Sequence, residues 1–155
     1  MGSEIYLEKK FLTVHECFEL ILNNRKKLQW ARTMKKNPYD SSVRITKNTI
    51  WKNDKHLEKK FKKSPLIFQF CEYATGYFYD WHNDYKTKNP DIKRIQTGII
   101  LLNDDFKGGE LEIKNYGVCN LKIGDCIWFD SKIDHRVLPV TDGLRYTLVT
   151  WLLNK

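Results

Sequence analysis

The second half of the chain is divided into short apolar runs separated by turn residues. Apolar runs occupy residues 66–70 and 95–102, and shorter apolar or alternating segments follow at 111–113, 121–123, 126–129 and 146–151. Gly124-Asp125 and Thr141-Asp142-Gly143 mark turns between them. Many short strands bounded by turns are typical of a β-sandwich or barrel. We therefore expect a β-core over about residues 66–153.

The first third of the chain shows helical spacing instead. Thr13 and Glu16 can form a capping box, in which each side chain accepts a hydrogen bond from the backbone amide of the other residue. The apolar residues that follow recur at the spacing of one helical face, namely Val14, Cys17, Phe18, Ile21 and Leu22. This pattern predicts a helix that runs to about Met34.

Turn residues at 37–42 predict the end of that helix. A second, shorter helix is expected near 50–63, with Ile50, Leu57 and Phe61 on its apolar side and lysines on the other. No internal repeat or low-complexity tract divides the chain. We therefore predict one domain over residues 1–155, mainly β, with a helical part at about 11–63 and the β-core behind it.

Composition and charge restrict the class of protein. The chain has 155 residues, of which 41% are hydrophobic and 30% charged, which suits one packed core and not a disordered segment. The net charge of +8 favours anionic partners. The lysine pairs are short and scattered, however, so we expect a solvated surface and no dedicated nucleic-acid face.

The cysteines and the hydropathy pattern predict a compartment. Cys17, Cys71 and Cys126 lie in apolar stretches, and none of the four cysteines forms a Cys-x-x-Cys motif, so free thiols in a reducing compartment are expected. The sequence shows no signal peptide and no apolar run of about 18 residues. We therefore expect a soluble, cytoplasmic protein that does not bind membranes, while its oligomeric state stays open.

Four residues of the second half form a candidate catalytic set. His82 and Asp84 are two apart, and on a strand the side chains of such residues project from the same face. Together with His135 they supply two imidazoles and a carboxylate, the ligand set of non-haem Fe(II) sites with open positions. Arg145, ten residues after His135 (145 − 135 = 10), could hold a substrate carboxylate beside that metal.

Each of these residues also has an ordinary structural interpretation. A His-x-Asp pair is common by chance, and His82 could be a surface residue that is hydrogen-bonded to Asp84. His135 could lie in a loop, and Arg145 could be an exposed cation at a strand end. The order of the four residues, with His-x-Asp first, then a distant His and then an Arg on the final strand, favours the metal site.

Several motifs around these residues follow one another in a fixed order. They are Tyr73-x-x-Gly76-x-x-Tyr79-x-x-His82-x-Asp84, then LNDDFKGGEL at 102–111, then Gly124-Asp125 leading to HRVLPV at 135–140, and finally Arg145 and Trp151. In this combination they resemble the 2-oxoglutarate- and Fe(II)-dependent oxygenases, most closely the prolyl 4-hydroxylase branch. The likeness covers nearly the whole chain and is strongest over residues 71–152.

The resemblance implies a fold and a set of bound groups. The implied fold is a double-stranded β-helix, a distorted jelly roll, buttressed by two or three α-helices. The implied metal is Fe(II), held by His82, Asp84 and His135. The implied cosubstrate is 2-oxoglutarate, which would chelate the iron at one end and meet Arg145 at the other, where a planar guanidinium can bond both carboxylate oxygens.

Further candidate contacts of 2-oxoglutarate also follow from the resemblance. They are Tyr73, Thr147, Thr97 and Trp151, although Tyr73 and Thr147 could equally be core residues. The chain departs from the family at Leu101, where a Tyr often donates to the far carboxylate. Thr97, Thr147 or Tyr73 would have to replace that donor.

The implied activity is hydroxylation of a substrate C–H bond with O2, coupled to conversion of 2-oxoglutarate to succinate and CO2. A peptide or protein is the expected partner, with a peptidyl proline as the first choice and ascorbate as a candidate reductant. Candidate substrate contacts are Arg44, Tyr79 and Trp81. The loop at 85–91 is a candidate lid, and the segment 41–44, which contains Arg44, resembles a second peptide-covering segment of the family. Both could equally be ordinary exposed loops.

Two alternatives to a prolyl hydroxylase stay open. The first is the same chemistry on a free amino acid, another small molecule or a nucleobase. The family's nucleobase demethylases carry a second Arg six residues after the first, whereas this chain has Trp151 there (145 + 6 = 151). The second, less favoured alternative is a basic module that binds nucleic acid without catalysis.

Overall fold

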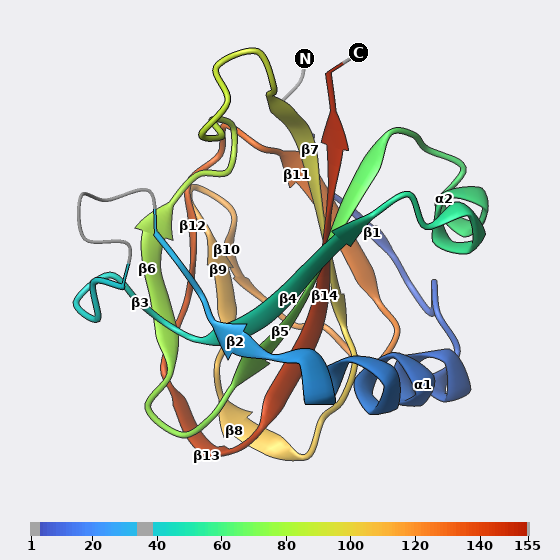
Figure 1. The fold of residues 1–155 in the computed structure, drawn as a ribbon. Helices are drawn as coiled ribbons and strands as arrows, with labels where there is room; N and C mark the ends of the chain where they lie inside the picture. The colour runs from blue at the N-terminus through green and yellow to red at the C-terminus, as the bar shows by residue number, and fades with distance from the viewer. Residues whose placement is uncertain (1–3, 34–38, 155) are drawn as a thin grey trace.

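Two antiparallel sheets form the body of the molecule (Figure 1). The computed structural model describes residues 4–33 and 39–154. In spatial order the major sheet consists of β1 (Tyr6–Glu8), β11 (Cys126–Asp130), β7 (Arg94–Leu101), β14 (Arg145–Leu153), β5 (Leu66–Tyr73), β4 (Lys47–Lys52) and β2 (Gln29–Trp30). The minor sheet consists of β10 (Gly117–Cys119), β9 (Leu111–Ile113), β12 (His135–Val137), β6 (Phe78–His82) and β3 (Arg44–Ile45). The mainly β architecture is as predicted.

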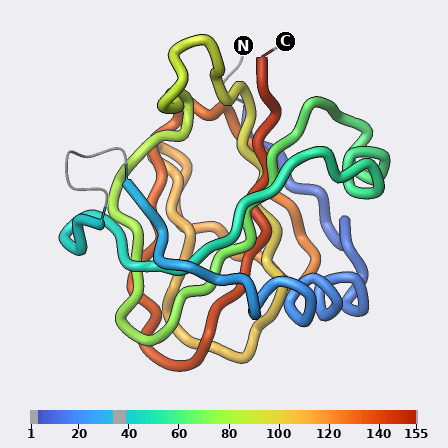
Figure 2. The backbone as a smooth tube through the Cα atoms, in the orientation of Figure 1, coloured from blue at the N-terminus to red at the C-terminus, as the bar shows by residue number. Residues whose placement is uncertain are grey.

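The remaining elements lie around the two sheets. β8 (Phe106–Gly108) pairs with β13 (Val140–Gly143) at one end of the molecule, at the bottom of Figure 2. The helices are α1 (Val14–Asn24) and α2 (Lys55–Phe61), and a short 3-10 turn (Arg25–Lys27) follows α1. In the described part of the chain, no helix is long and apolar enough to cross a membrane.

Strand alternation divides the core into two layers. On β5, Phe68 and Phe70 belong to the cluster that also contains the buried residues of both helices. Cys71 and Tyr73 of the same strand belong to a second cluster, which contains Ile113 of the minor sheet and so lies between the sheets. One face of the major sheet is therefore covered by helices, and the other faces the minor sheet.

The capping box at the start of α1 is confirmed, but the predicted length of this helix is wrong. The Glu16 amide donates to Thr13 Oγ1 at 3.0 Å, and the Thr13 amide donates to Glu16 Oε1 at 2.9 Å. The helix ends at Asn24, well before Met34, because the chain beyond it turns to pair β2 with β4. Sheet pairing here overrides local helical propensity. Met34 itself and residues 37–38 of the predicted break lie outside the described residues.

The predicted apolar face of α1 is only partly buried. Cys17 and Ile21 pack into the core, whereas Val14, Phe18 and Leu22 are exposed by 66%, 56% and 38%. Those three residues lie on the solvent side of the helix, so the buried stripe is narrower than the spacing predicted.

The second helix is shorter than predicted. Residues 50–52 belong to β4, which pairs with β5 from Lys47 to Lys52. The helix begins only after Asp54, whose carboxylate accepts from the Leu57 amide at 3.0 Å. Leu57 and Phe61 are buried as predicted, but Ile50 is a strand residue and 54% exposed. The described residues of the predicted helical part at 11–63 thus form the strands β2, β3 and β4 as well as the helices α1 and α2.

Two smaller predictions in the β-core are also wrong. The alternating segment 121–123 is not a strand, since the neighbouring strand β10 ends at Cys119. The 141–143 segment forms the last three residues of β13 and is not only a turn. The four cysteines are free, and Cys17, Cys71 and Cys126 are buried, as predicted.

Candidate metal centre

An irregularity in β6 places two side chains of this strand on the same side. His82 lies opposite His135 of β12, and Tyr79 lies opposite Val137. The register therefore shifts, because three residue steps along β6 pair with two along β12. On a regular strand Tyr79 and His82 would point to opposite faces, but one extra residue in a β-bulge brings them to the same face. Their rings stack with centroids 3.5 Å apart.

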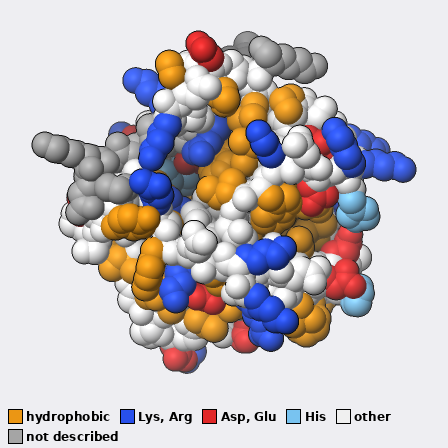
Figure 3. All heavy atoms as spheres, viewed as in Figure 1, with side chains coloured by type: hydrophobic (Ala, Val, Ile, Leu, Met, Phe, Trp, Pro, Cys, Tyr) orange, Lys and Arg blue, Asp and Glu red, His pale blue; other side chains and the backbone are white. Residues whose placement is uncertain are grey.

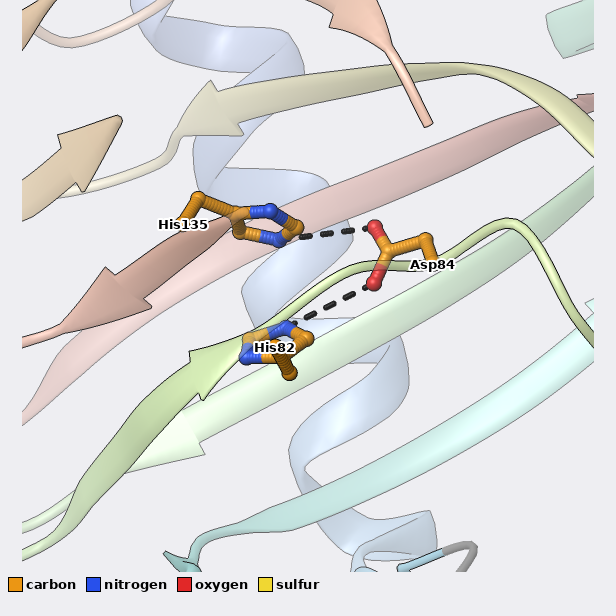
Figure 4. Close-up of side chains that lie close together, drawn as sticks. All are labelled: His82, Asp84 and His135. Atoms are coloured by element: carbon orange, nitrogen blue, oxygen red, sulfur yellow. Dashed lines mark ion pairs between the residues drawn. The ribbon is translucent and has the colours of Figure 1, made fainter. Parts of the chain in front are cut away.

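His82, Asp84 and His135 converge on one point between the two sheets (Figure 4). Asp84 Oδ1 lies 3.5 Å from His82 Nε2, and Asp84 Oδ2 lies 3.5 Å from His135 Nε2. One ligand atom from each residue lies within 4.8 Å of the others. His82 ends β6, and Asp84 follows just beyond the strand with its side chain on the same side, as the two-residue spacing predicts.

The backbone fixes which nitrogen each histidine presents to this point. His82 Nδ1 lies 2.7 Å from the Asp80 carbonyl oxygen, and His135 Nδ1 lies 3.1 Å from the Ile133 carbonyl oxygen. A carbonyl only accepts, so each Nδ1 is the protonated donor and each Nε2 keeps its lone pair. Such outer hydrogen bonds orient metal-binding imidazoles.

Asp84 is oriented by two further donors. Thr97 Oγ1 donates to Asp84 Oδ2 at 2.9 Å, and Trp151 Nε1 donates to the same oxygen at 3.0 Å. Thr97 is fully buried and also bonds Ser131 Oγ at 2.8 Å, so it lies behind the carboxylate and is not among the residues that line the adjacent cavity. The structure therefore gives Thr97 a contact with Asp84, and its contact with 2-oxoglutarate stays a prediction.

The protonation states in this cluster suit metal binding. Burial and the neighbouring His135 lower the pKa of His82 to about 3, so its imidazole is neutral near pH 7. Burial alone would raise the pKa of Asp84, but the two histidines and the Trp151 hydrogen bond lower it to about 2. A neutral imidazole and an ionised carboxylate are the forms that bind metal ions.

A cavity of about 560 Å³ opens beside the cluster. On the face seen in Figure 3, basic side chains gather around a hollow. The residues lining the cavity include His82, Asp84 and His135, together with Tyr73, Arg145, Thr147 and Trp151. The structure thus brings four of the five predicted 2-oxoglutarate contacts to the same cavity as the three predicted metal ligands.

Arg145 lies at the start of β14 and is buried, with 3% of its surface exposed. Its guanidinium carbon lies 5.3 Å from the centroid of the Tyr73 ring. Within residues 4–33 and 39–154, no carboxylate oxygen lies within ion-pair distance of it. Gly109 leaves room for it, since a Cβ there would lie 2.8 Å from Arg145 Cδ. A buried cation without a carboxylate partner, facing a cavity, is suited to an anionic ligand.

Leu101 is buried and does not line the cavity. The cavity wall instead contains Gln69, which was not among the predicted site residues, and Cys71, which was predicted only as a free thiol. Gln69 Nε2 donates to Cys71 Sγ at 3.1 Å, and Asn48 Nδ2 donates to Gln69 Oε1 at 2.9 Å. Burial raises the pKa of Tyr73, which keeps its phenol protonated and able to donate.

Two of the three predicted substrate contacts line the cavity. Arg44 lies over the Tyr79 ring, with its guanidinium carbon 4.2 Å from the ring centroid. Trp81 does not line it: because of the β6 bulge it points outward and packs under Arg136, 4.6 Å from the guanidinium carbon. Thr87, Lys88 and Asn89 of the predicted lid loop do line the cavity. Arg94, which was not among the predicted site residues, also lines the cavity. The sequence indicates this cation only by its position at the start of the apolar strand β7.

Comparisons with known proteins agree with this geometry. Residues 68–153 match the family model described as the 2OG-Fe(II) oxygenase superfamily. A PKHD-type hydroxylase of Psychrobacter sp. is 28% identical over 138 residues, which are 83% of this chain and 53% of that protein. A PKHD-type hydroxylase of Pseudomonas fluorescens is 33% identical over 89 residues, which are 51% of this chain and 39% of that protein. The chain thus spans about half the length, or less, of these relatives.

Solved structures share the fold over nearly the whole chain. A Pseudomonas putida prolyl-4-hydroxylase superposes with a TM-score of 0.76 at 18% identity, covering 99% of this chain and 94% of that one. The viral collagen prolyl hydroxylase of Paramecium Bursaria Chlorella virus-1, solved as a 2OG complex, gives 0.73 at 20% identity, covering 98% and 96%. The predicted double-stranded β-helix is therefore confirmed, and the family match over residues 68–153 shows that the chain belongs to the 2-oxoglutarate- and Fe(II)-dependent oxygenase superfamily.

Proposed function

We propose that the chain is a 2-oxoglutarate- and Fe(II)-dependent dioxygenase that hydroxylates a C–H bond, with a peptidyl proline as its substrate. One observation carries the proposal: the ligand atoms of His82, Asp84 and His135 lie within 4.8 Å of one another beside a cavity that is also lined by Arg145, a buried cation with no ion pair to any described residue. A His–Asp cluster with a purely structural role would not require a buried arginine on the wall of the same cavity.

The donor set fits Fe(II). Two imidazole nitrogens and one carboxylate on one side of a metal ion leave its remaining positions open for other ligands. The Asp80 carbonyl accepts a hydrogen bond from His82, and the Ile133 carbonyl accepts one from His135. Trp151 donates a hydrogen bond to Asp84. Such support reduces the reorganisation that metal binding requires.

Arg145 fits the far carboxylate of 2-oxoglutarate. Its planar guanidinium can donate two hydrogen bonds to one carboxylate, and the buried position strengthens that ion pair. Tyr73 and Thr147 are the neighbouring groups that can donate in place of the missing tyrosine at Leu101, since Thr147 pairs with Leu101 on the adjacent strand and faces the cavity. Gln69 is a further candidate donor on the same wall.

When bound, Fe(II) and 2-oxoglutarate supply the oxidative chemistry, in which O2 is consumed, succinate and CO2 are released and a substrate C–H bond is hydroxylated. The side chains of this chain hold and orient the reactants. Arg145 fixes the cosubstrate, the two histidines and Asp84 fix the metal, and the apolar wall that includes Ile99 and Val149 restricts water. Ascorbate stays a prediction as the reductant.

The choice of proline is supported by the relatives' names. Solved structures that share this fold include prolyl hydroxylases, and one from Trichoplax adhaerens, with a TM-score of 0.74, was solved with a peptide fragment of hypoxia inducible factor. The curated relatives are named only PKHD-type hydroxylases. A peptide also suits a cavity whose outer wall carries the exposed Trp30 and Tyr39.

The proposal is tested by anaerobic titration of Fe(II) and then 2-oxoglutarate into the protein, followed by visible absorption. We expect a weak charge-transfer band that is absent from His82→Ala. Succinate release is then measured with O2 and proline-containing peptides. Equal iron binding by the wild type and His135→Ala would overturn the metal site, and turnover that is unchanged in Arg145→Ala would overturn the cosubstrate site. An intact band without peptide-dependent succinate would overturn only the proline substrate.

A further inference from the structure

Two arginines line the cavity, and one aromatic side chain lies between each arginine and a predicted metal ligand. Arg44 lies over Tyr79, whose ring stacks on His82 at 3.5 Å between centroids. Arg94 lies over Trp151, with its guanidinium carbon 3.8 Å from the ring centroid, and Trp151 donates to Asp84. The two guanidinium groups are thus held on aromatic faces next to the predicted metal ligands.

Neither arginine has a carboxylate partner in the described part of the chain. The ion pairs of residues 4–33 and 39–154 include neither Arg44 nor Arg94. The Nε atom of each is buried and has no hydrogen-bond partner. Arg44 Nη1 donates only to the Arg32 carbonyl, at 2.9 Å. Buried donors of this kind are unfavourable unless a ligand satisfies them.

The two arginines also oppose each other electrostatically. Burial lowers the pKa of Arg94, and the positive charge of Arg44 contributes in the same direction. Asp84, the carboxylate whose charge acts on Arg94, already accepts from Trp151 and Thr97 and lies next to both histidines. Asp84 therefore stabilises the charge of Arg94 only at a distance, and it forms no ion pair with either arginine among the described residues.

Binding of Fe(II) and 2-oxoglutarate would leave the positive charges of Arg44 and Arg94 unbalanced. The two charges of Fe(II) and the one of Arg145 balance Asp84 and the two carboxylates of 2-oxoglutarate. Nothing in that set offsets Arg44 or Arg94, and Arg32 and Lys88 add further positive charge to the cavity wall. A third bound anion would restore the balance.

We propose that Arg44 and Arg94 together bind a carboxylate of the substrate, so that the substrate class of this site is anionic. The inference rests on the proposed function and adds to it the chemistry that the substrate must carry. Two sources have this chemistry: the side chain of an acidic residue next to the reacting proline of a peptide, and the α-carboxylate of a free amino acid.

Calorimetric binding tests the proposal without turnover. The protein is loaded anaerobically with Fe(II) and N-oxalylglycine, a 2-oxoglutarate analogue that is not decarboxylated, so that Arg145 is occupied. One probe pair is the capped peptide Gly-Pro-Asp-Gly and its Asn counterpart. The other pair is free L-proline and L-prolinamide. Within each pair the members differ by one negative charge and little else.

We expect the acid of one pair to bind about ten- to a hundredfold more tightly than its amide, the range for hydrogen bonds to a charged group. The pair that shows the preference identifies the source. The double variant Arg44→Gln/Arg94→Gln should abolish the preference. Arg25→Gln, which removes an exposed arginine outside the cavity, should keep it.

Equal affinities of acid and amide in both pairs would overturn the proposal, as would a preference that survives in the double variant. Absence of binding in both pairs also counts against it, because the two arginines alone should give the acids measurable affinity. The charge-transfer band of the double variant with Fe(II) and 2-oxoglutarate separates the outcomes. An intact band shows that the variant is folded and loaded, so the loss concerns only the substrate carboxylate, whereas a missing band in the wild type contradicts the proposed function itself.

Discussion

The hydrogen bond from Trp151 to Asp84 can be removed with little change in shape. Trp151→Phe deletes the indole N–H that lies 3.0 Å from Asp84 Oδ2, while an aromatic ring remains to pack under Arg94. Hydrogen bonds to a charged group contribute about 1.5–3 kcal/mol, and loss of a partner behind a metal ligand typically weakens metal affinity about 10- to 100-fold. Thr97 still donates to the same oxygen, so we expect the lower end, about tenfold.

The assay is anaerobic Fe(II) titration of the wild type, Trp151→Phe, Thr97→Val and the double variant. Because both donors bond one oxygen, their effects should not be additive, and the double variant should lose more than the two single losses combined. Trp51→Phe is the matched control, since it removes an indole–carboxylate hydrogen bond of 3.0 Å to Asp54, away from the site. An Fe(II) affinity in Trp151→Phe within twofold of the wild type, in a folded protein, would refute the reasoning.

Further predictions concern the cosubstrate pocket, pH and the helix. Gly109→Ala should push Arg145 aside and weaken 2-oxoglutarate binding at least about tenfold, with Fe(II) affinity retained; equal 2-oxoglutarate titrations would contradict this. His82 has a folded pKa of about 3, below its unfolded value of about 6.5, so the unfolded state binds more protons. The metal-free protein should therefore lose stability, on the order of a few kcal/mol, as pH falls through that window, and His82→Gln should flatten the dependence in urea titrations. Ile21→Ala should destabilise by about 2–4 kcal/mol in the same titrations, whereas exposed Phe18→Ser should change stability by less than about 0.5 kcal/mol.

The sequence predicted the metal cluster because its signal is local and chemical. The two-residue spacing of His82 and Asp84 carries directly into three dimensions at the end of a strand. The position of His135 opposite His82 depends on sheet pairing, which the spacing alone does not contain; only the order of the motifs pointed to it. The same holds for Arg145, whose burial without a carboxylate partner could be seen only in the folded chain.

The predictions failed where long-range pairing decides local structure. Residues 50–52 fall within the predicted second helix, yet Ile50 and Trp51 have high strand propensity and pair with β5. Helical spacing at Val14, Phe18 and Leu22 likewise does not reveal which side of a helix another element will cover. Trp81 was misplaced for a third reason, because a bulge of one residue reverses the side to which a strand residue points.

That single additional residue in β6 limits how the site can be engineered. Grafting His82 and Asp84 onto a regular strand of another scaffold would reproduce the ligand pair but turn the equivalent of Tyr79 toward solvent. The stacked ring that supports His82, and the arginine resting on that ring, would both be lost. A designer who wishes to transplant this centre must therefore copy the backbone defect along with the ligands.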